Sequence, residues 1–301
     1  MVRSKVKEGS DKMDKTTKYM MISMVSNLFL SVLKIVFGFI SNMKSLIADG
    51  IHSFSDLITD MVAIFGNRLS KKPADDGHPR GHGKIEYITS LIISCFILVL
   101  GLSILKNSFS KTDTIPNPYL IIVVIITIVT KYFLSYILIR KGKEINNMIL
   151  ISSGKESYTD VYSSILVLVV IILSQFYDKI NVLKYSDMIG SILISVLILS
   201  MGIKLLFQNL SLLIGESEQD LTKIERVKEI INNRNEKFIL EECTLFKLGS
   251  YYEVVLKILV DGSTSVKEGH ELMDEIEYDL LNSDMNIKYA MIHIEPIEDD
   301  K

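Results

Sequence analysis

The segment YLIIVVIITIVTKYFLSYILI, residues 119–139, sets the class of this protein, because Lys131 is the only charged residue in it. The hydrocarbon core of a bilayer is ~30 Å thick and is crossed by a helix of ~20 apolar residues. Other stretches of similar length and character lie on both sides of this one. The predicted spans cover residues 19–40, 46–69, 87–105, 119–139, 149–176 and 188–207. The sequence therefore predicts a membrane protein with six transmembrane helices.

The overall composition excludes several other classes. Of the 301 residues, 48% are hydrophobic and 23% are charged, with a mean hydropathy of +0.31, which excludes a disordered chain. A net charge of -3 gives no basic field, so nucleic acid is not expected as a partner. The two cysteines, Cys95 and Cys243, cannot form a disulfide framework or a cysteine-based zinc knuckle. Membrane lipid is the partner that this composition indicates.

The orientation follows from the Lys and Arg residues in the connections between the spans. Fifteen lie in residues 1–18, in the second and fourth connections and, as Arg68 and Lys155, in the adjoining ends of the second and fifth spans, against five on the other side. Because basic residues stay on the inner side, both termini are predicted in the cytoplasm and the chain in the cell membrane. We expect a cytoplasmic tail at 1–18, a transmembrane domain at 19–210 and a cytoplasmic domain at 211–301.

The last third has the pattern of a small soluble α+β domain. A helical spacing covers 218–233 and a second covers 265–282, while strand-like stretches cover 238–247, 251–260 and 288–295. Gly249 and Ser250 separate the first two strands as a hairpin signal. The predicted order is α-β-β-α-β, an open sheet with helices on one face. About 85 residues make a small core, so pairing with a second copy is expected. The spans themselves show no convincing internal repeat.

Ionisable residues inside the second and fifth spans need an explanation, because each is costly at membrane depth unless it faces a partner or a cavity. His52 and Asp56 are four residues apart and share a helix face, and Glu156 and Asp160 repeat this spacing. On facing helices they would bring one imidazole and three carboxylates together, the ligand number of a tetrahedral divalent metal. A lone histidine is more often a packing residue, but two matched pairs favour a metal site.

Four other charged residues lie near these pairs. Asp49 precedes His52 by almost one turn and either extends the site or supports it as an outer acceptor. Asp60 is interpreted as part of an aqueous vestibule. For Lys34 and Lys131 the preferred interpretation is snorkelling of the ammonium group toward a polar layer, and a counter-charge to the acidic cluster is the alternative.

The connection PADDGHPRGHGK, residues 73–84, holds a second candidate site. Asp75, His78 and His82 are spaced so that a tight loop, shaped by its glycines and Pro79, can bring them together on a zinc-like ion. A solvated basic loop is the alternative for Arg80 and Lys84.

Three motifs resemble the cation diffusion facilitator family of metal transporters. They are IADGIHSFSD at 47–56, DDGHPRGHGKIE at 75–86 and ESYTDVYSS at 156–164. The resemblance covers nearly the whole chain and implies six spans, a ferredoxin-like C-terminal domain, a homodimer, and export of a divalent metal by proton antiport.

The same resemblance implies where metal binds. The transport site falls on His52, Asp56, Glu156 and Asp160, and the loop site falls on Asp75, His78 and His82. The positions at or near the family's cytoplasmic metal sites are Cys243, His270, His293 and Glu295. The metal is the substrate, with Zn²⁺ as the first expectation and Fe²⁺, Mn²⁺ and Co²⁺ as alternatives. No organic cofactor is expected.

The sequence departs from the family pattern at three places. Glu156 stands where zinc members commonly have His or Asp, and a carboxylate there hardens the site toward Fe²⁺, Mn²⁺ or Co²⁺. Lys257 occupies what resembles a ligand position in the C-terminal domain. Lys84 is present, but Ser211 stands where some members carry an Asp that pairs with this lysine.

Two other functions compete with transport. An intramembrane metalloenzyme would need a general base at an open metal site, and the chain has no His-Glu-x-x-His motif. A membrane-anchored sensor that binds metal in the C-terminal domain is the second alternative. We expect a transporter and not an enzyme.

Overall fold

The structure is a computed structural model of the chain. It describes residues 2–70, 72–110, 115–145, 147–176, 180–232 and 238–297. Lys71, Lys111 and Lys179, which enter the charge comparison above, lie outside these ranges.

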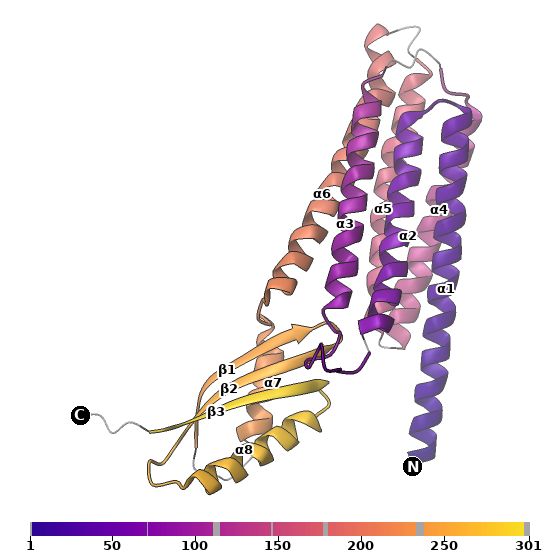
Figure 1. Cartoon of the computed structure of the whole chain (residues 1–301). Coiled ribbons are helices and arrows are strands. Elements are labelled where there is room, and N and C mark those ends of the chain that lie inside the picture. Colours follow the sequence, from indigo (N-terminus) through magenta and orange to yellow (C-terminus); the bar gives the residue numbers. More distant parts are fainter. Residues whose placement is uncertain are drawn as a thin grey trace. The chain divides into compact units, whose positions relative to one another are not determined.

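The apolar part of the described chain forms six long helices (Figure 1). Each predicted span corresponds to one of them, and the fifth helix ends two residues before its predicted end. The helices are α1 (Val2–Ile40), α2 (Lys44–Ser70), α3 (Ile85–Ser108), α4 (Tyr119–Glu144), α5 (Met148–Ser174) and α6 (Ser186–Ile214), with the short 3-10 helix η1 (Asn181–Tyr185) before α6.

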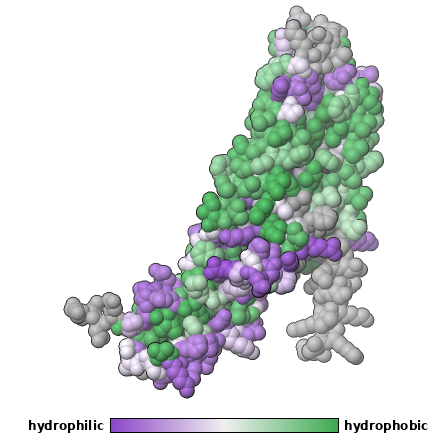
Figure 2. Space-filling model, in the orientation of Figure 1, coloured by the Kyte–Doolittle hydropathy of each residue, from purple (hydrophilic) through white to green (hydrophobic). Residues whose placement is uncertain are grey.

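By length and composition, five of the described helices qualify to cross a membrane: α1, α3, α4, α5 and the stretch ending with α6. Large apolar side chains such as Val99 and Ile122 are more than 60% exposed on them, and Figure 2 shows an apolar surface along the long helices. The predicted helical membrane domain is confirmed. α2 is not among the five, and it is the helix that carries Asp49, His52, Asp56 and Asp60.

Two helix pairs, α1–α2 and α4–α5, pack through glycines. A β-carbon added to any of four glycines would lie 2.9 to 3.0 Å from a backbone nitrogen of the facing helix, so this close approach requires glycine. The contacts join Gly38 with Ile47, Gly50 with Ile35, Gly142 with Ile151 and Gly154 with Ile139.

These contacts reveal an internal repeat, so the expectation that the spans contain none is wrong. Positions 38 and 142 differ by 104, as do 47 and 151, 50 and 154, and 35 and 139. The same offset relates His52 to Glu156 and Asp56 to Asp160. The two polar pairs therefore occupy equivalent positions in two similarly packed helix pairs.

Asp187, in the first turn of α6, binds the first turn of α2. Its carboxylate accepts hydrogen bonds from the backbone N–H groups of Lys44 (3.0 Å) and Ser45 (2.9 Å) and from the Ser45 hydroxyl (2.6 Å). The first N–H groups of a helix have no partner within it, so this carboxylate satisfies them from outside.

The C-terminal part has the predicted α-β-β-α-β order. It contains α7 (Leu221–Asn232), β1 (Ile239–Leu248), β2 (Tyr251–Val260), α8 (Val266–Leu281) and β3 (Ile287–Pro296). In the sheet β2 is central, antiparallel to β1 and parallel to β3. Ser265 and Glu268 form a capping box at the start of α8.

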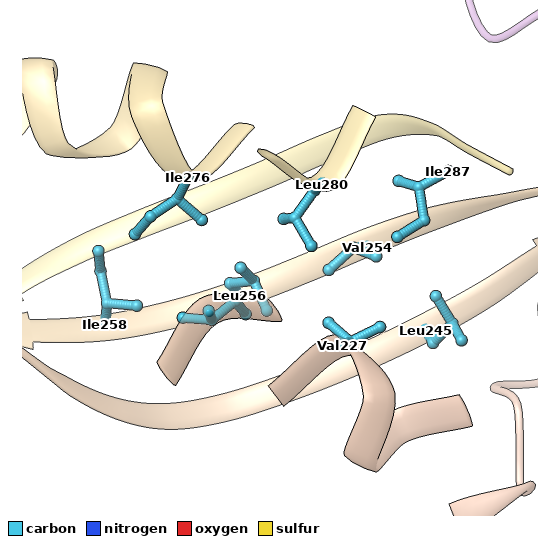
Figure 3. Close-up of a cluster of buried hydrophobic side chains, with 9 residues drawn as sticks. Val227, Leu245, Val254, Leu256, Ile258, Ile276, Leu280 and Ile287 are labelled. Atoms are coloured by element: carbon cyan, nitrogen blue, oxygen red, sulfur yellow. The ribbon is translucent and has the colours of Figure 1, made fainter. Parts of the chain in front are cut away.

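The core of this small domain lies between the sheet and both helices (Figure 3). Val254, Leu256 and Ile258 alternate along β2, so their side chains share one face of the sheet. They pack with Val227 from α7 and Ile276 from α8. The predicted placement of the helices on one face is therefore confirmed.

Candidate metal centres

The first centre lies between α2 and α5. His52 and Asp56 of α2 and Asp160 of α5 each offer a ligand atom, and these atoms lie within 4.8 Å of one another. The His52 Nε2 atom is 4.0 Å from Asp160 Oδ1. Both aspartates are buried, with 6% and 3% of their surface exposed. We call these three residues the buried triad.

Two polar atoms of the buried triad lack hydrogen-bond partners among the described residues. They are Nδ1 of His52 and Oδ2 of Asp56. A buried polar atom without a partner is costly, and such atoms are rare outside functional sites. Nitrogen and carboxylate oxygen are donors that divalent transition metals accept, so the residues fit a metal ion.

Lys131 of α4 forms an ion pair with one residue of the buried triad. Its ammonium group is fully buried and lies 2.5 Å from Asp160 Oδ2. Lys34 of α1 is also fully buried and lies 2.8 Å from Asp49 Oδ2. The preferred interpretation of both lysines as snorkelling side chains is wrong, because each is paired with a buried carboxylate. The counter-charge alternative describes them correctly.

Asp49 belongs to a network beside the buried triad. Besides Lys34, its carboxylate accepts hydrogen bonds from the hydroxyls of Ser163 (2.6 Å) and Ser164 (3.1 Å) of α5. Its oxygens are thus already engaged by three donors. Of its two predicted roles, the structure agrees with an outer support and places it outside the triad.

Glu156 is not part of the triad among the described residues. It lies four residues before Asp160 on α5 and is exposed. Its carboxylate interacts electrostatically with Asp56, Asp60 and Asp160. The structure therefore brings together three of the four predicted transport-site residues and leaves Glu156 beside them.

The second centre lies in the connection between α2 and α3. Asp75, His78 and His82 again offer ligand atoms within 4.8 Å of one another. Asp75 Oδ1 is 3.0 Å from His78 Nδ1, and Asp75 Oδ2 is 3.4 Å from His82 Nε2. Asp75 and His78 are exposed, whereas only 8% of His82 is. These three residues, the loop triad, are brought together as the spacing suggested.

Hydrogen bonds prepare the loop triad for a cation. The hydrogen bond from His78 holds the pKa of Asp75 at about 2, well below its ordinary value. The His82 Nδ1 atom is 3.1 Å from the Pro73 carbonyl oxygen, which can only accept, so Nδ1 carries the proton. The other ring nitrogen, Nε2, faces Asp75 Oδ2 at 3.4 Å and is the ring atom that remains for a cation.

Two tyrosines fix the loop onto the β1–β2 turn. The Tyr251 hydroxyl accepts from the Gly83 backbone N–H (3.0 Å) and donates to the Arg80 carbonyl (2.8 Å). The Tyr87 hydroxyl accepts from the Gly249 N–H (2.8 Å) and donates to the Lys247 carbonyl (3.1 Å). Sequence reasoning missed both tyrosines, and no spacing in the chain links residues so far apart.

Arg80 and Lys84 also contribute to this fixation. Arg80 Nε donates to Glu253 Oε1 of β2 at 2.8 Å. Lys84 Nζ donates to the Leu213 carbonyl near the end of α6 at 3.3 Å. The last carbonyls of a helix lack partners within it and attract cations. Lys84 thus uses a backbone acceptor near Ser211, where some family members have an Asp.

The four residues suggested for a site in the C-terminal domain do not all come together; among the described residues only His293 and Glu295 contact each other. Cys243 of β1 packs against the hydrophobic core, and burial raises the pKa of its thiol. His293 and Glu295 of β3 alternate with core residues, so they lie on the opposite face of the sheet. They bond each other at 3.0 Å. On α8, His270 pairs with Asp274 at 3.6 Å.

Lys257 occupies the face of the sheet that carries Glu295. Its ammonium group lies 2.9 Å from Glu241 and 2.9 Å from Glu295. The hydrogen bond from Lys257 lowers the pKa of Glu295, and the two carboxylates raise the pKa of Lys257. A fixed ammonium group therefore already neutralises this acidic cluster.

Comparison with known families covers both parts of the chain. Residues 20–214 match the cation efflux transmembrane domain, and residues 220–297 match the cytoplasmic domain of cation efflux proteins. The second model describes a dimerisation domain, which supports a dimer. Members of this family are membrane transporters and not enzymes.

Similar proteins of known name span nearly the full length. A manganese efflux system protein of Bacillus subtilis, MneP, is 25% identical over 96% of this chain and 98% of its own. An uncharacterised transporter of Methanocaldococcus jannaschii is 27% identical over 95% of this chain and 100% of its own. A solved structure of the putative zinc transporter CzrB matches 29% of this chain and 98% of its own, with 26% identity and a TM-score of 0.24. This chain belongs to the cation efflux, or cation diffusion facilitator, family of metal transporters.

Proposed function

We propose that this protein exports a divalent transition metal from the cytoplasm in exchange for protons, and that the metal binds at the buried triad. The observation that carries this proposal is the convergence of three donor atoms from α2 and α5 within 4.8 Å, two of whose residues hold unpartnered buried atoms. Ionisable groups are retained at membrane depth when an ion or a proton uses them.

Mn²⁺ is the first metal to test. The buried triad provides two carboxylates and one imidazole. In this proposal Glu156, one turn before Asp160 on α5, adds a third carboxylate by a change of rotamer. Sites rich in carboxylate oxygen suit Mn²⁺, whereas zinc prefers softer ligands such as imidazole nitrogen and thiolate sulfur. The relatives named for manganese efflux support the same order of testing. Zn²⁺, Fe²⁺ and Co²⁺ are the competing substrates.

Protons are the proposed counter-substrate. Metal ligands must be deprotonated to bind, so loading of the triad releases protons and protonation from the outer side ejects the metal. In this scheme both termini are cytoplasmic, residues 19–210 form the transport domain and residues 211–301 form the cytoplasmic domain. The loop triad binds a second ion on the cytoplasmic side, where Tyr251 and Tyr87 link it to the dimerisation domain.

The test uses the full-length protein in vesicles that contain a metal-sensitive dye. We expect Mn²⁺ entry into the vesicles to become faster when the proton concentration is higher inside than outside. The entry should slow down when a protonophore removes this proton gradient. Equal flux with and without the gradient would contradict antiport. Competition by Zn²⁺, Fe²⁺ and Co²⁺ in the same vesicles ranks the substrates.

Asp56→Asn and Asp60→Asn form a matched pair of variants. Both replace an aspartate of α2 with its isosteric amide, one turn apart, but only Asp56 belongs to the buried triad. We expect Asp56→Asn to abolish flux and Asp60→Asn to retain most of it. Full flux in a folded Asp56→Asn protein would refute the assignment of the site.

A further inference from the structure

The internal repeat reveals an asymmetry at the buried triad. Asp56 and Asp160 occupy equivalent positions, separated by the common offset of 104 residues. At the same offset, the counterpart of Lys131 is Asn27 of α1. Asn27 is buried, and its Oδ1 atom has no partner among the described residues. Of the two equivalent carboxylates, Asp160 thus has a lysine beside it. The position that corresponds to this lysine in the half of the repeat with Asp56 holds a neutral amide.

The two oxygens of Asp160 face different groups. Oδ2 lies 2.5 Å from Lys131 Nζ, and Oδ1 lies 4.0 Å from His52 Nε2. Lys131 therefore holds one oxygen of the carboxylate and directs the other toward the ligand atoms of α2. A metal at the triad would meet Asp160 through Oδ1 alone.

Lys34 provides a comparison within the same helix bundle. Its ammonium group contacts Asp49 at 2.8 Å and donates to Ser164 (2.9 Å) and Ser53 (3.3 Å). This lysine is surrounded by acceptors, none of which belongs to the buried triad. Lys131, in contrast, contacts a ligand residue directly. The two lysines are similarly buried, but only Lys131 forms an ion pair with a residue of the buried triad, and Lys34 interacts with Asp56 more weakly.

We propose that Lys131 determines the metal affinity of the buried triad by acting as a permanent counter-charge. This proposal rests on the proposed function of the triad. With His52 neutral, Asp56 and Asp160 carry two negative charges, and Lys131 offsets one of them. A dication then binds less tightly than it would to the two carboxylates alone, and a more weakly held ion leaves faster. Lys131 thus lowers the affinity of the triad for the metal and raises the transport rate.

The test replaces Lys131 with the residue that the repeat places at the equivalent position. In Lys131→Asn, removal of one positive charge at contact distance should tighten Mn²⁺ binding at least about tenfold, because charge interactions are strong in a buried site. Affinity is measured on the purified full-length protein by competition with a metal indicator. Flux in vesicles should show a lower KM together with a lower maximal rate.

Two controls separate charge from packing. Lys131→Arg keeps the charge and should retain the wild-type affinity within a few-fold. Lys34→Leu removes the other buried charge and introduces the residue found at its own repeat counterpart, position 138. It should lower the melting temperature and tighten Mn²⁺ binding much less than Lys131→Asn does, because Lys34 contacts no residue of the buried triad. Unchanged or weaker binding in a folded Lys131→Asn protein would overturn the proposal.

The reciprocal variant keeps the proposal testable if Lys131→Asn does not fold. Asn27→Lys adds a positive charge at the position that the repeat makes equivalent to Lys131, and it should weaken Mn²⁺ binding at least about tenfold. Unchanged affinity in that variant would also overturn the proposal. Asp56→Asn, measured in parallel, reports on the site itself. If Asp56→Asn leaves Mn²⁺ affinity intact, the proposed transport site fails; if it weakens binding while Lys131→Asn has no effect, only the role of Lys131 fails.

Discussion

The buried triad and the loop triad use the same two residue types in opposite surroundings. The buried triad has two aspartates and one histidine on rigid helices, and two of its polar atoms lack partners among the described residues. The loop triad has one aspartate and two histidines, and Asp75 already bonds His78. In the buried triad, donor atoms remain without hydrogen bonds to other described residues, whereas in the loop triad Asp75 and His78 are hydrogen-bonded to each other.

This difference suggests different tasks. Donors fixed by helix packing can release an ion without collapsing, which suits a cation that passes through. Donors that hydrogen-bond one another, supported by Tyr251 from the neighbouring sheet, form a shape that a resident cation would stabilise. We expect loss of the buried triad to abolish transport, and loss of the loop triad to alter it.

The largest expected difference comes from a matched pair of histidine variants. His52→Ala removes a ligand of the buried triad and should reduce Mn²⁺ flux at least about 100-fold, since even outer supports of metal ligands contribute 10- to 100-fold. His82→Ala removes the least exposed ligand of the loop triad and should leave flux within about tenfold of wild type. Vesicle assays on both proteins measure this contrast. Equal losses would show that the triads form one functional unit.

A smaller effect is expected when the support of the loop triad is removed. Tyr251→Phe leaves the Gly83 N–H and the Arg80 carbonyl without their partner, which costs ~1–3 kcal/mol locally. Amide exchange at Gly83 should become faster, and metal affinity of the loop triad should fall about tenfold, since 1.4 kcal/mol corresponds to a factor of ten. Tyr278→Phe is the control, because Tyr278 is 68% exposed. Unchanged exchange at Gly83 in Tyr251→Phe would contradict the supporting role.

The smallest effect concerns pH. The pKa of Asp75 is about 2, below its ordinary value of 3.8, because His78 donates to its carboxylate. The bonds of ionised Asp75 therefore contribute fully above about pH 4 and are lost as pH falls through about 2. A carboxyl titration followed by NMR should show this midpoint, and His78→Ala should return it toward the ordinary value. A midpoint near 3.8 in the unaltered protein would exclude the hydrogen bond.

The sequence predicted those features that depend on local spacing. Apolar runs located the helices, strand and turn signals located the small sheet, and the four-residue spacing of His52 and Asp56 placed them on one helix face. The partners of Lys34 and Lys131 were misjudged, because they lie on other helices and nothing local identifies them. The long aliphatic stem of a lysine favours snorkelling when no buried partner is known.

Two further errors had signals in the sequence. Gly38 and Gly50 recur as Gly142 and Gly154 at a constant offset, and 13 of the 35 residues in 22–56 are identical to their counterparts in 126–160. This signal was overlooked until the packing of the two helix pairs pointed to it. In the C-terminal domain, strand alternation places Cys243 with the core residue Leu245. This alternation alone places Cys243 on the core face of the sheet, opposite the face that carries His293 and Glu295.

The hydrogen bonds between Asp187 and the first turn of α2 fix that end of the helix, so that the helix can tilt about this point. Asp56 lies twelve residues further along, or ~18 Å at the helical rise, so a tilt of ~5° about Lys44 displaces it by ~1.5 Å. Such a shift is enough to take a carboxylate out of bonding distance from a metal. A small tilt of this anchored helix can thus move Asp56 out of the proposed metal site, and the bond to Asp187 determines the point about which the helix turns.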